Sequence, residues 1–258
     1  MKNESKTRDF IKFLGTAGAR IVVAKQLRAS GGMWLSLDGT NLLIDPGPGS
    51  LVRCLASRPK LDPTKLDGIV LSHKHLDHAA DINVMMEAMT MGGYEKRGTV
   101  LVPGDAITGD DPVIYKYVRP YVSKIEVIKE KGKYKIGNIE ISAPVKHIHG
   151  VETYGLIFKG KKHAISWVTD SKFFPELPRK YKGDILIVSV LRVEPSKLDH
   201  LCIEDVKKII KAVKPRVTIL THFGMWMIKA KPWEVAEKLS KELHTKVIAA
   251  SDGMQFDL

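Results

Sequence analysis

Four side chains that can bind a metal ion lie within six consecutive positions of the chain. They are His73, His75, Asp77 and His78, and they directly follow the apolar segment 67–71. Because side chains alternate with a period of two in extended backbone, His73 and His75 are expected to point to the same side. A backbone that then curls turns Asp77 and His78 toward a second point. Imidazole and carboxylate are typical zinc ligands, so the segment indicates two metal ions rather than a histidine-rich surface loop.

A site for two metal ions needs more ligands than these four, and the rest of the chain offers them. The end of a buried strand is where a rigid backbone meets solvent, so a side chain at that place is positioned accurately. The candidates that stand at the ends of apolar, β-type segments are Asp45, His149, Asp170 and His222.

Short β-type segments that could position these ligands occur throughout the chain. Strands are expected at 11–14, 33–37, 42–44, 69–71, 99–102, 125–128, 134–136, 139–143, 154–158, 163–168, 185–191, 217–220, 247–250 and 254–256. Helical patterns are expected at 81–91, 112–118, 203–213 and 232–244. The strands both meander and alternate with helices, which favours two sheets packed face to face with helices outside. No repeat, low-complexity tract or linker divides the chain, so one domain spanning 1–258 is expected.

The composition is that of a globular protein. Apolar residues make up 44% and charged residues 27% of the chain, which excludes a disordered or collagen-like polymer. No apolar run approaches the roughly 18 residues that cross a bilayer, and the polar start lacks the apolar region of a secretory signal. Cys54 and Cys202 are too few for a disulfide scaffold. We therefore expect a cytoplasmic protein with no membrane partner.

The net charge of +12 has two interpretations. Lysines and arginines can neutralise the phosphates of a nucleic acid. They can equally be the solvated exterior of helices such as 203–213, and a composition rich in Lys and Glu but poor in Gln also suits heat adaptation. The densest basic run, 129–135, is expected at the tip of a hairpin. The charge by itself does not decide between these interpretations.

Taken together, the motifs resemble those of the metallo-β-lactamase superfamily. The resemblance rests on the segment 15–18, the loop after Asp45, the cluster 73–78, His149, Asp170 and the segment 221–224, which follow the family's order over nearly the whole chain. It implies an α/β (α+β) fold, a four-layer αβ/βα sandwich of two mixed sheets with outer helices and the metals at one edge. It further implies a loop-stabilising role for Asp45. The implied metal ligands are His73, His75 and His149 for the first ion, Asp77, His78 and His222 for the second, and Asp170 as the bridge between them.

One assignment in this ligand set is ambiguous. His147 and His149 stand two residues apart, so an extended backbone could present either one to the same side. We prefer His149 because it lies five residues before the pair Tyr154-Gly155, the spacing typical of the phosphodiesterase branch of the family. His163 and His244 match no motif and are expected to be ordinary surface or packed histidines.

Three features indicate the branch of the superfamily. His75 stands where flavo-di-iron oxygen reductases have a glutamate, and Ala79-Ala80 replaces the glycines of glyoxalase II. The segment 197–201, which contains His200, is similar to the branch that includes RNase Z and a cyclic phosphodiesterase of phosphonate breakdown. The resemblance implies that His200 assists the phosphate or the leaving group. The chain departs from RNase Z in lacking a long Gly/Pro-rich arm, and from the cyclic phosphodiesterase in lacking the cysteines of an additional zinc site.

The expected function is that of a dinuclear metal-dependent hydrolase that acts on cyclic or oligonucleotide phosphodiesters through a metal-bridging hydroxide. His200 and the metal ligand Asp77 are its expected catalytic residues. Zinc is the expected metal, with manganese and iron(II) as alternatives. The substrate is a small phosphodiester or RNA, and the oligomeric state stays open, a homo-oligomer included. The alternatives are an RNase Z-like RNA-processing nuclease and a metal-binding sensor protein without turnover.

Overall fold

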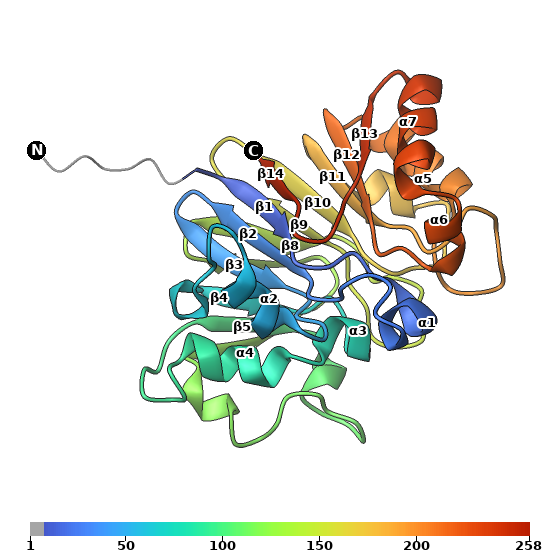
Figure 1. Ribbon diagram of the computed structural model, residues 1–258. Coiled ribbons are helices and arrows are strands. Elements are labelled where there is room, and N and C mark those ends of the chain that lie inside the picture. Colours follow the sequence, from blue (N-terminus) through green and yellow to red (C-terminus); the bar gives the residue numbers. More distant parts are fainter. Residues whose placement is uncertain (1–7) are drawn as a thin grey trace, which may run out of the picture.

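Two β-sheets form the centre of the molecule (Figure 1). The structure is a computed structural model and describes residues 8–258. The first sheet has the order β14-β1-β2-β3-β4-β5-β6 and the second the order β13-β12-β11-β10-β9-β8-β7. The strands of the first sheet are β1 Phe10–Phe13, β2 Met33–Leu37, β3 Thr40–Ile44, β4 Gly68–Val70, β5 Thr99–Val102, β6 Lys124–Val127 and β14 Gln255–Asp257. Those of the second are β7 Gly132–Ile136, β8 Ile139–Ala143, β9 Leu156–Lys159, β10 Ala164–Val168, β11 Ile185–Ser189, β12 Val217–Thr221 and β13 Lys246–Ala249.

Helices cover the outer faces of both sheets. Figure 1 shows α2 and α4 outside the first sheet, and α5 and α7 outside the second. The α-helices are α1 Ala19–Ala24, α2 Ser50–Ala56, α3 Leu76–Ala79, α4 Ile82–Met89, α5 Ile203–Val213, α6 Met225–Lys229 and α7 Pro232–Leu243. Short 3-10 helices occur at Pro63–Lys65, Gly104–Ala106, Arg119–Tyr121 and Leu177–Lys180.

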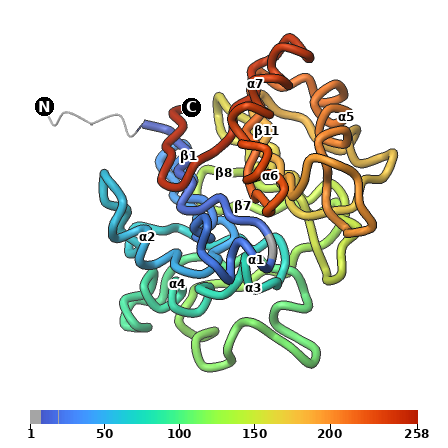
Figure 2. Tube along the Cα trace, turned by 45° about the vertical axis from the view of Figure 1, so that its right-hand side comes forward, coloured from blue at the N-terminus to red at the C-terminus, as the bar shows by residue number. Residues whose placement is uncertain are grey.

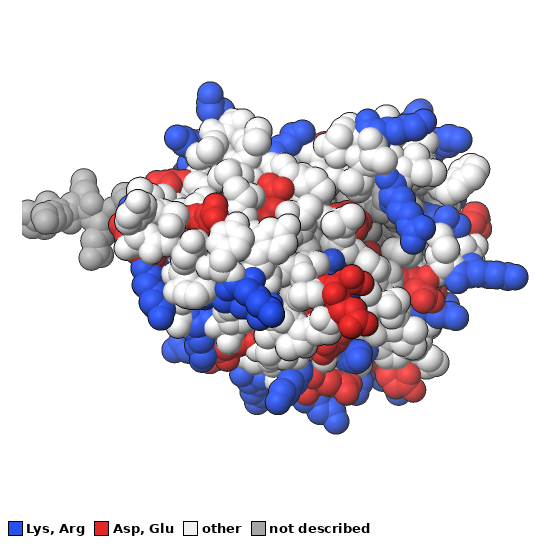
Figure 3. All heavy atoms as spheres, turned by 90° about the horizontal axis from the view of Figure 1, so that it is seen from below, with Lys and Arg blue, Asp and Glu red and all other residues white. Residues whose placement is uncertain are grey.

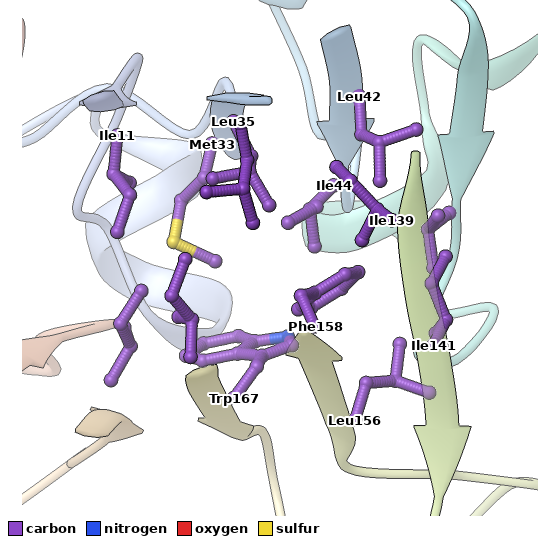
Figure 4. Close-up of a cluster of buried hydrophobic side chains, with 14 of the residues drawn as sticks. Ile11, Met33, Leu35, Leu42, Ile44, Ile139, Ile141, Leu156, Phe158 and Trp167 are labelled. Carbon is purple, nitrogen blue, oxygen red and sulfur yellow. The ribbon is translucent and has the colours of Figure 1, made fainter. Parts of the chain in front are cut away.

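The alternation of side chains along each strand creates the layers. In β3, Leu42 and Ile44 belong to the apolar core between the sheets, whereas Leu43 packs in the layer beneath α4. Figure 4 shows Leu42 and Ile44 facing Phe158 and Trp167 across the space between the sheets. Burying each such side chain stabilises the fold by roughly 1.5–3 kcal/mol. The αβ/βα sandwich predicted from the sequence is confirmed.

The pairing of the strands sets the edge at which polar side chains gather. β3, β4, β5 and β6 run parallel in the first sheet, and β10, β11, β12 and β13 run parallel in the second. Within each set the carboxyl ends therefore share one edge. The hairpins β1–β2–β3 and β7–β8–β9 are antiparallel, which makes both sheets mixed.

The prediction of a helix at 112–118 is wrong. This segment forms bends and one turn, and most of its backbone hydrogen bonds go to partners outside the segment. The N–H groups of Val113 and Ile114 donate to the Ala106 carbonyl at 3.0 and 3.1 Å. The Arg119 guanidinium donates to the Ile114 carbonyl at 2.8 Å. Tertiary hydrogen bonds thus replace the helical ones that the apolar spacing suggested.

The basic run 129–135 does not form a hairpin tip either. β6 ends at Val127 in the first sheet and β7 begins at Gly132 in the second, so the run crosses between the sheets. The turn of the β7–β8 hairpin lies at Gly137, whose φ of +55° suits glycine. Among residues 8–258, no helix combines the length and apolar character needed to span a bilayer.

Candidate metal centre

Eight imidazole and carboxylate side chains from five separate segments meet at one edge of the two sheets. They come from the turn after β4 together with α3, from the loop after β8, from the ends of β10 and β12, and from the loop before α5. The tube in Figure 2 shows α1 and α3, which flank this edge, lying close together. The converging side chains are His73, His75, Asp77, His78, His149, Asp170, His200 and His222.

Six of these side chains form two clusters of three. The first cluster consists of His73, His75 and His149, and the second of Asp77, His78 and His222; in each, one nitrogen or oxygen atom per residue lies within 4.8 Å of the others. In the first cluster, His149 Nε2 is 3.1 Å from His75 Nδ1. In the second, His222 Nε2 is 3.0 Å from His78 Nε2 and 3.2 Å from Asp77 Oδ2. The division arises because α3 begins directly after His75 and turns the next side chains to a second point.

Asp170 lies between the two clusters and is almost fully buried. Its Oδ2 is 3.9 Å from His73 Nε2 in the first cluster and 3.6 Å from His78 Nε2 in the second. Its Oδ1 is 3.4 Å from His222 Nδ1. One carboxylate therefore faces both clusters, as expected of a bridging ligand.

Several buried polar atoms at this place suit a divalent cation. Within the described residues, His73 Nε2, Asp170 Oδ1 and His222 Nδ1 are buried and have no hydrogen-bond partner. An unsatisfied buried polar atom costs about 1–3 kcal/mol, so a group of them calls for an explanation. Imidazole nitrogens and carboxylate oxygens that converge on common points are the donors that zinc and similar ions accept. The side chains present therefore fit the metal ions that the fold family implies.

Burial sets the protonation of the first cluster. It lowers the pKa of His73 well below the usual range and also lowers those of His75 and His149, so these imidazoles are neutral. For Asp170 burial acts in the opposite direction, but the imidazoles of His222 and His200 outweigh it and lower its pKa well below that of an ordinary aspartate. Neutral imidazole beside ionised carboxylate is the combination that binds metal.

The buried Asp45 carboxylate contacts the second cluster through Nδ1 of His78, the ring nitrogen that faces away from Asp170. Asp45 Oδ2 is 3.1 Å from His78 Nδ1, and the Trp167 indole N–H donates to the same oxygen at 3.1 Å. The backbone N–H and hydroxyl of Ser72 donate to its two oxygens at 2.6 and 2.8 Å. Burial by itself would lower the pKa of His78. The carboxylates of Asp77, Asp170 and Asp45 outweigh burial, and the net pKa of His78 is raised. The bond at Nδ1 directs Nε2 of His78 toward Asp170.

The structure places His149, not His147, in the first cluster. The Asp199 carbonyl lies 3.0 Å from His149 Nδ1, which leaves Nε2 facing His75. His147 points elsewhere, with its Nε2 2.5 Å from the Tyr181 hydroxyl. Burial lowers the pKa of His147 to about 4, so it is a neutral, packed residue. Of the two histidines without a motif, His163 binds Asp184 at 2.9 Å and His244 ends α7, both outside the clusters.

His200 stands beside the bridging position. Its Nε2 is 3.2 Å from Asp170 Oδ2, and its Nδ1 is buried without a partner among residues 8–258. Burial lowers its pKa, but the bond to the Asp170 carboxylate outweighs burial, and the net pKa is raised. His149, Asp170 and His200 also form a group of metal-binding geometry. The location therefore allows His200 either to act on a bound substrate or to join the ligand set.

A cleft of about 610 Å³ opens beside the clusters and gives access to them. Asp77, His149 and His200 line it, together with Arg20 of α1. Sequence reasoning did not identify Arg20. The six residues of α1 are too few for a helical period to be read, so no pattern indicates that an arginine would face the cleft.

Comparisons with known proteins agree with this geometry. The sequence model of a family described as β-lactamase superfamily domain matches residues 40–223. The uncharacterized protein MJ1374 of Methanocaldococcus jannaschii is 28% identical over 96% of this chain and 94% of its own. The probable metallo-hydrolase YhfI of Bacillus subtilis is 28% identical over 76% of this chain and 82% of its own. Ribonuclease Z of Borreliella burgdorferi is 22% identical over 96% of each chain.

Solved structures share the fold. The metallo-β-lactamase fold protein YhfI from Bacillus subtilis superimposes with a TM-score of 0.77 at 20% identity, over 97% of this chain and 100% of that one. A diphosphatase from the PhnP family superimposes with a TM-score of 0.71 at 21% identity, over 97% of this chain and 98% of that one. These likenesses establish the architecture of the sandwich over nearly its whole length.

Proposed function

The chain belongs to the metallo-β-lactamase superfamily, and from that premise we propose that it is a dinuclear metal-dependent hydrolase of phosphodiesters. The observation that carries the proposal is the pair of clusters on either side of Asp170, with His200 3.2 Å from the same carboxylate. Relatives named ribonuclease Z support a phosphodiester as the substrate, and a structural neighbour named a diphosphatase supports reaction at phosphorus more generally.

The two clusters and Asp170 make up the proposed ligand set. The first cluster would hold one ion, the second cluster the other, and Asp170 would bridge them. Zinc is the expected metal because imidazole and carboxylate bind it more tightly than manganese or iron(II), although the supply of metal in the cell can override this order. When bound, such a pair of ions lowers the pKa of a water and neutralises charge on a phosphoryl group.

The surrounding residues prepare the site for that chemistry. Asp45 keeps the proton of His78 on Nδ1, so that Nε2 is free to bind metal. Ser72 does the same for His73, whose Nδ1 is 3.0 Å from the serine hydroxyl. Asp77 is both a proposed ligand and a catalytic residue, because its carboxylate lies in the wall of the cleft where substrate enters.

His200 is the proposed general acid. It lines the cleft, with its Nε2 3.2 Å from Asp170 Oδ2, and an imidazole can carry and release a proton in the physiological pH range. Donating that proton to the departing alkoxide oxygen would avoid the release of a strong base. A positioned acid of this kind contributes about 100-fold to 10,000-fold to the rate.

Hydrolysis of bis(p-nitrophenyl) phosphate by protein reconstituted with zinc tests the proposal, because this diester needs only the metal centre. We expect turnover that a chelator abolishes. The Asp170→Asn variant should lose both this turnover and the bound metal. His200→Gln should leave the metal content and the hydrolysis of this diester nearly unchanged, because p-nitrophenolate leaves without a proton. On a cyclic nucleotide, whose leaving group is an alkoxide, His200→Gln should lower kcat by about 100-fold or more, while the control His163→Gln alters neither activity nor metal content. Loss of metal from His200→Gln would instead make His200 a ligand. Bound metal with no turnover of any phosphodiester would favour a metal-binding sensor.

RNA processing is the second candidate, and the relatives named ribonuclease Z favour it. The net charge adds little support. On the face that Figure 3 shows, the view of Figure 1 from below, Lys and Arg side chains are scattered among acidic and uncharged ones. Cleavage of a structured RNA that weakens steeply with rising salt would support this candidate. Hydrolysis of cyclic nucleotides with no cleavage of RNA would exclude it.

A further inference from the structure

We propose that a groove beside the metal centre binds a nucleobase and the flanking phosphates of a single-stranded oligonucleotide. The proposal rests on the proposed function, because the scissile phosphodiester of that strand would lie at the metals. The groove runs between α1 and α6, which lie near each other in Figure 1. The segments that precede the two helices are joined by hydrogen bonds from the Gly18 N–H to the Phe223 carbonyl and from the Phe223 N–H to the Thr16 carbonyl.

The groove continues directly from the catalytic cleft. It has a volume of about 360 Å³, and Arg20, Leu198 and His200 line both it and the cleft at the clusters. Arg192 and Trp226 line both the groove and an outer hollow of about 580 Å³. A path of shared walls therefore leads from the proposed general acid to Trp226. A small cyclic phosphodiester would fill only its inner end.

An exposed tryptophan stands along this path. The side chain of Trp226 is 59% exposed, whereas Trp34 and Trp167 are 2% and 3% exposed and belong to the cores. The Lys229 ammonium lies 4.8 Å from the centroid of the Trp226 ring. The ammonium covers one face of the ring, so a base of a single strand would stack on the opposite face, as bases do on aromatic side chains whatever the sequence.

The cations along the groove have no acidic partners. Among the described residues, neither Arg20 nor Arg192 forms an ion pair, and the lining of the groove contains no carboxylate, whereas the adjoining cleft at the clusters does. Nε of Arg192 is buried without a hydrogen-bond partner. The planar guanidinium group donates two parallel hydrogen bonds, which match a phosphate. The outer hollow has one acid, Glu194, opposite Lys229 and Arg192 in its lining. The balance of charge along the path is positive, as a polyanionic strand requires.

Binding of a fluorescent single-stranded RNA of about six nucleotides, followed by anisotropy, tests the proposal directly. We expect Trp226→Ala to raise Kd by about 5-fold to 150-fold and Trp226→Phe to raise it less, because a phenyl ring still stacks. The matched control is Trp233→Ala, since Trp233 is 58% exposed on α7 and lines none of these hollows. It should bind as the wild type does.

The salt dependence gives a second, independent readout. Each phosphate contact contributes about −0.7 to the slope of log K against log salt for a single strand, so Arg20→Gln should make the slope shallower by about that amount. Equal Kd values for Trp226→Ala and Trp233→Ala would overturn the proposal. So would a sedimentation coefficient of the RNA-free protein that falls in Trp226→Ala, because the groove would then be covered by a second copy of the chain. Hydrolysis of bis(p-nitrophenyl) phosphate by the wild type, measured separately, shows whether the metal centre itself is active.

Discussion

Replacing Asp45 by Asn tests how the site is held together. The Asp45 carboxylate accepts four hydrogen bonds, two from Ser72, one from Trp167 and one from His78. An amide in its place can keep an oxygen toward the Ser72 N–H, but its NH₂ group then faces the donors of Trp167 and His78. The Trp167 donor is left unpaired whichever ring nitrogen of His78 carries the proton, and one buried donor without a partner predicts a loss of about 1–3 kcal/mol in the free energy of unfolding.

The same substitution should weaken metal binding. If His78 accepts a hydrogen bond from the new amide at Nδ1, its proton moves to Nε2, the atom that faces Asp170. That imidazole can no longer bind metal through Nε2, and loss of an outer-shell partner of this kind typically costs 10-fold to 100-fold in affinity.

Urea denaturation with a chelator present and zinc titration against a competing indicator measure the two effects of Asp45→Asn separately. Asp67→Asn is the control. Asp67 accepts one hydrogen bond, from the Asn41 N–H at 2.8 Å, and stands before β4, at the end of the strand away from the metal site. We expect about 1 kcal/mol of destabilisation and unchanged zinc affinity for the control. If Asp45→Asn behaved like Asp67→Asn in both assays, the role assigned to Asp45 would be refuted.

Three further predictions concern the whole molecule. Removing bound zinc with a chelator should lower Tm by about 10 °C, since a ligand at a thousand times its Kd contributes about 4 kcal/mol; an unchanged Tm would contradict metal binding. Burial by itself would raise the pKa of Asp184, but hydrogen bonds from His163 and Ala164 outweigh burial, and the net pKa is lowered. The ionised Asp184 carboxylate therefore stabilises the folded protein above the unfolded pKa of about 3.9, and this stabilisation is lost as the pH falls through the pKa of the folded state. Asp184→Asn should therefore be less stable than the wild type at neutral pH, with a gap that narrows in acid, and a gap independent of pH would contradict this. Burial raises the pKa of Cys54 to about 12 and also raises that of Cys202, so neither thiol should react with a disulfide reagent before the protein unfolds; rapid labelling of the folded protein would show that the thiols are accessible.

The sequence predicted the site better than it predicted the segments around it. The cluster 73–78 can be recognised from the sequence because metal-binding residue types follow a strand at a suitable spacing. His149, Asp170 and His222 lie at the expected edge of the sheets. What settles the place of His147 is the Tyr181 hydroxyl, a contact across the fold that periodicity cannot reveal.

The failures have a common cause. At 112–118 the apolar spacing suits a helix, but tertiary hydrogen bonds to Ala106 and Arg119 determine the backbone. The groove was missed because Arg20 and Trp226 lie on α1 and α6, of six and five residues, which are too short to show a period. Local pattern identifies residues that act with their sequence neighbours, whereas a surface assembled from short, distant helices requires the fold.

Anomalous diffraction at the zinc edge from crystals of the zinc-loaded protein shows directly whether the site binds two ions. Two peaks per chain about 3.5–4 Å apart should appear, one bound by His73, His75 and His149, the other by Asp77, His78 and His222, with Asp170 contacting both. A single peak, or peaks bound by other side chains, would contradict the dinuclear centre on which the proposed hydrolysis depends.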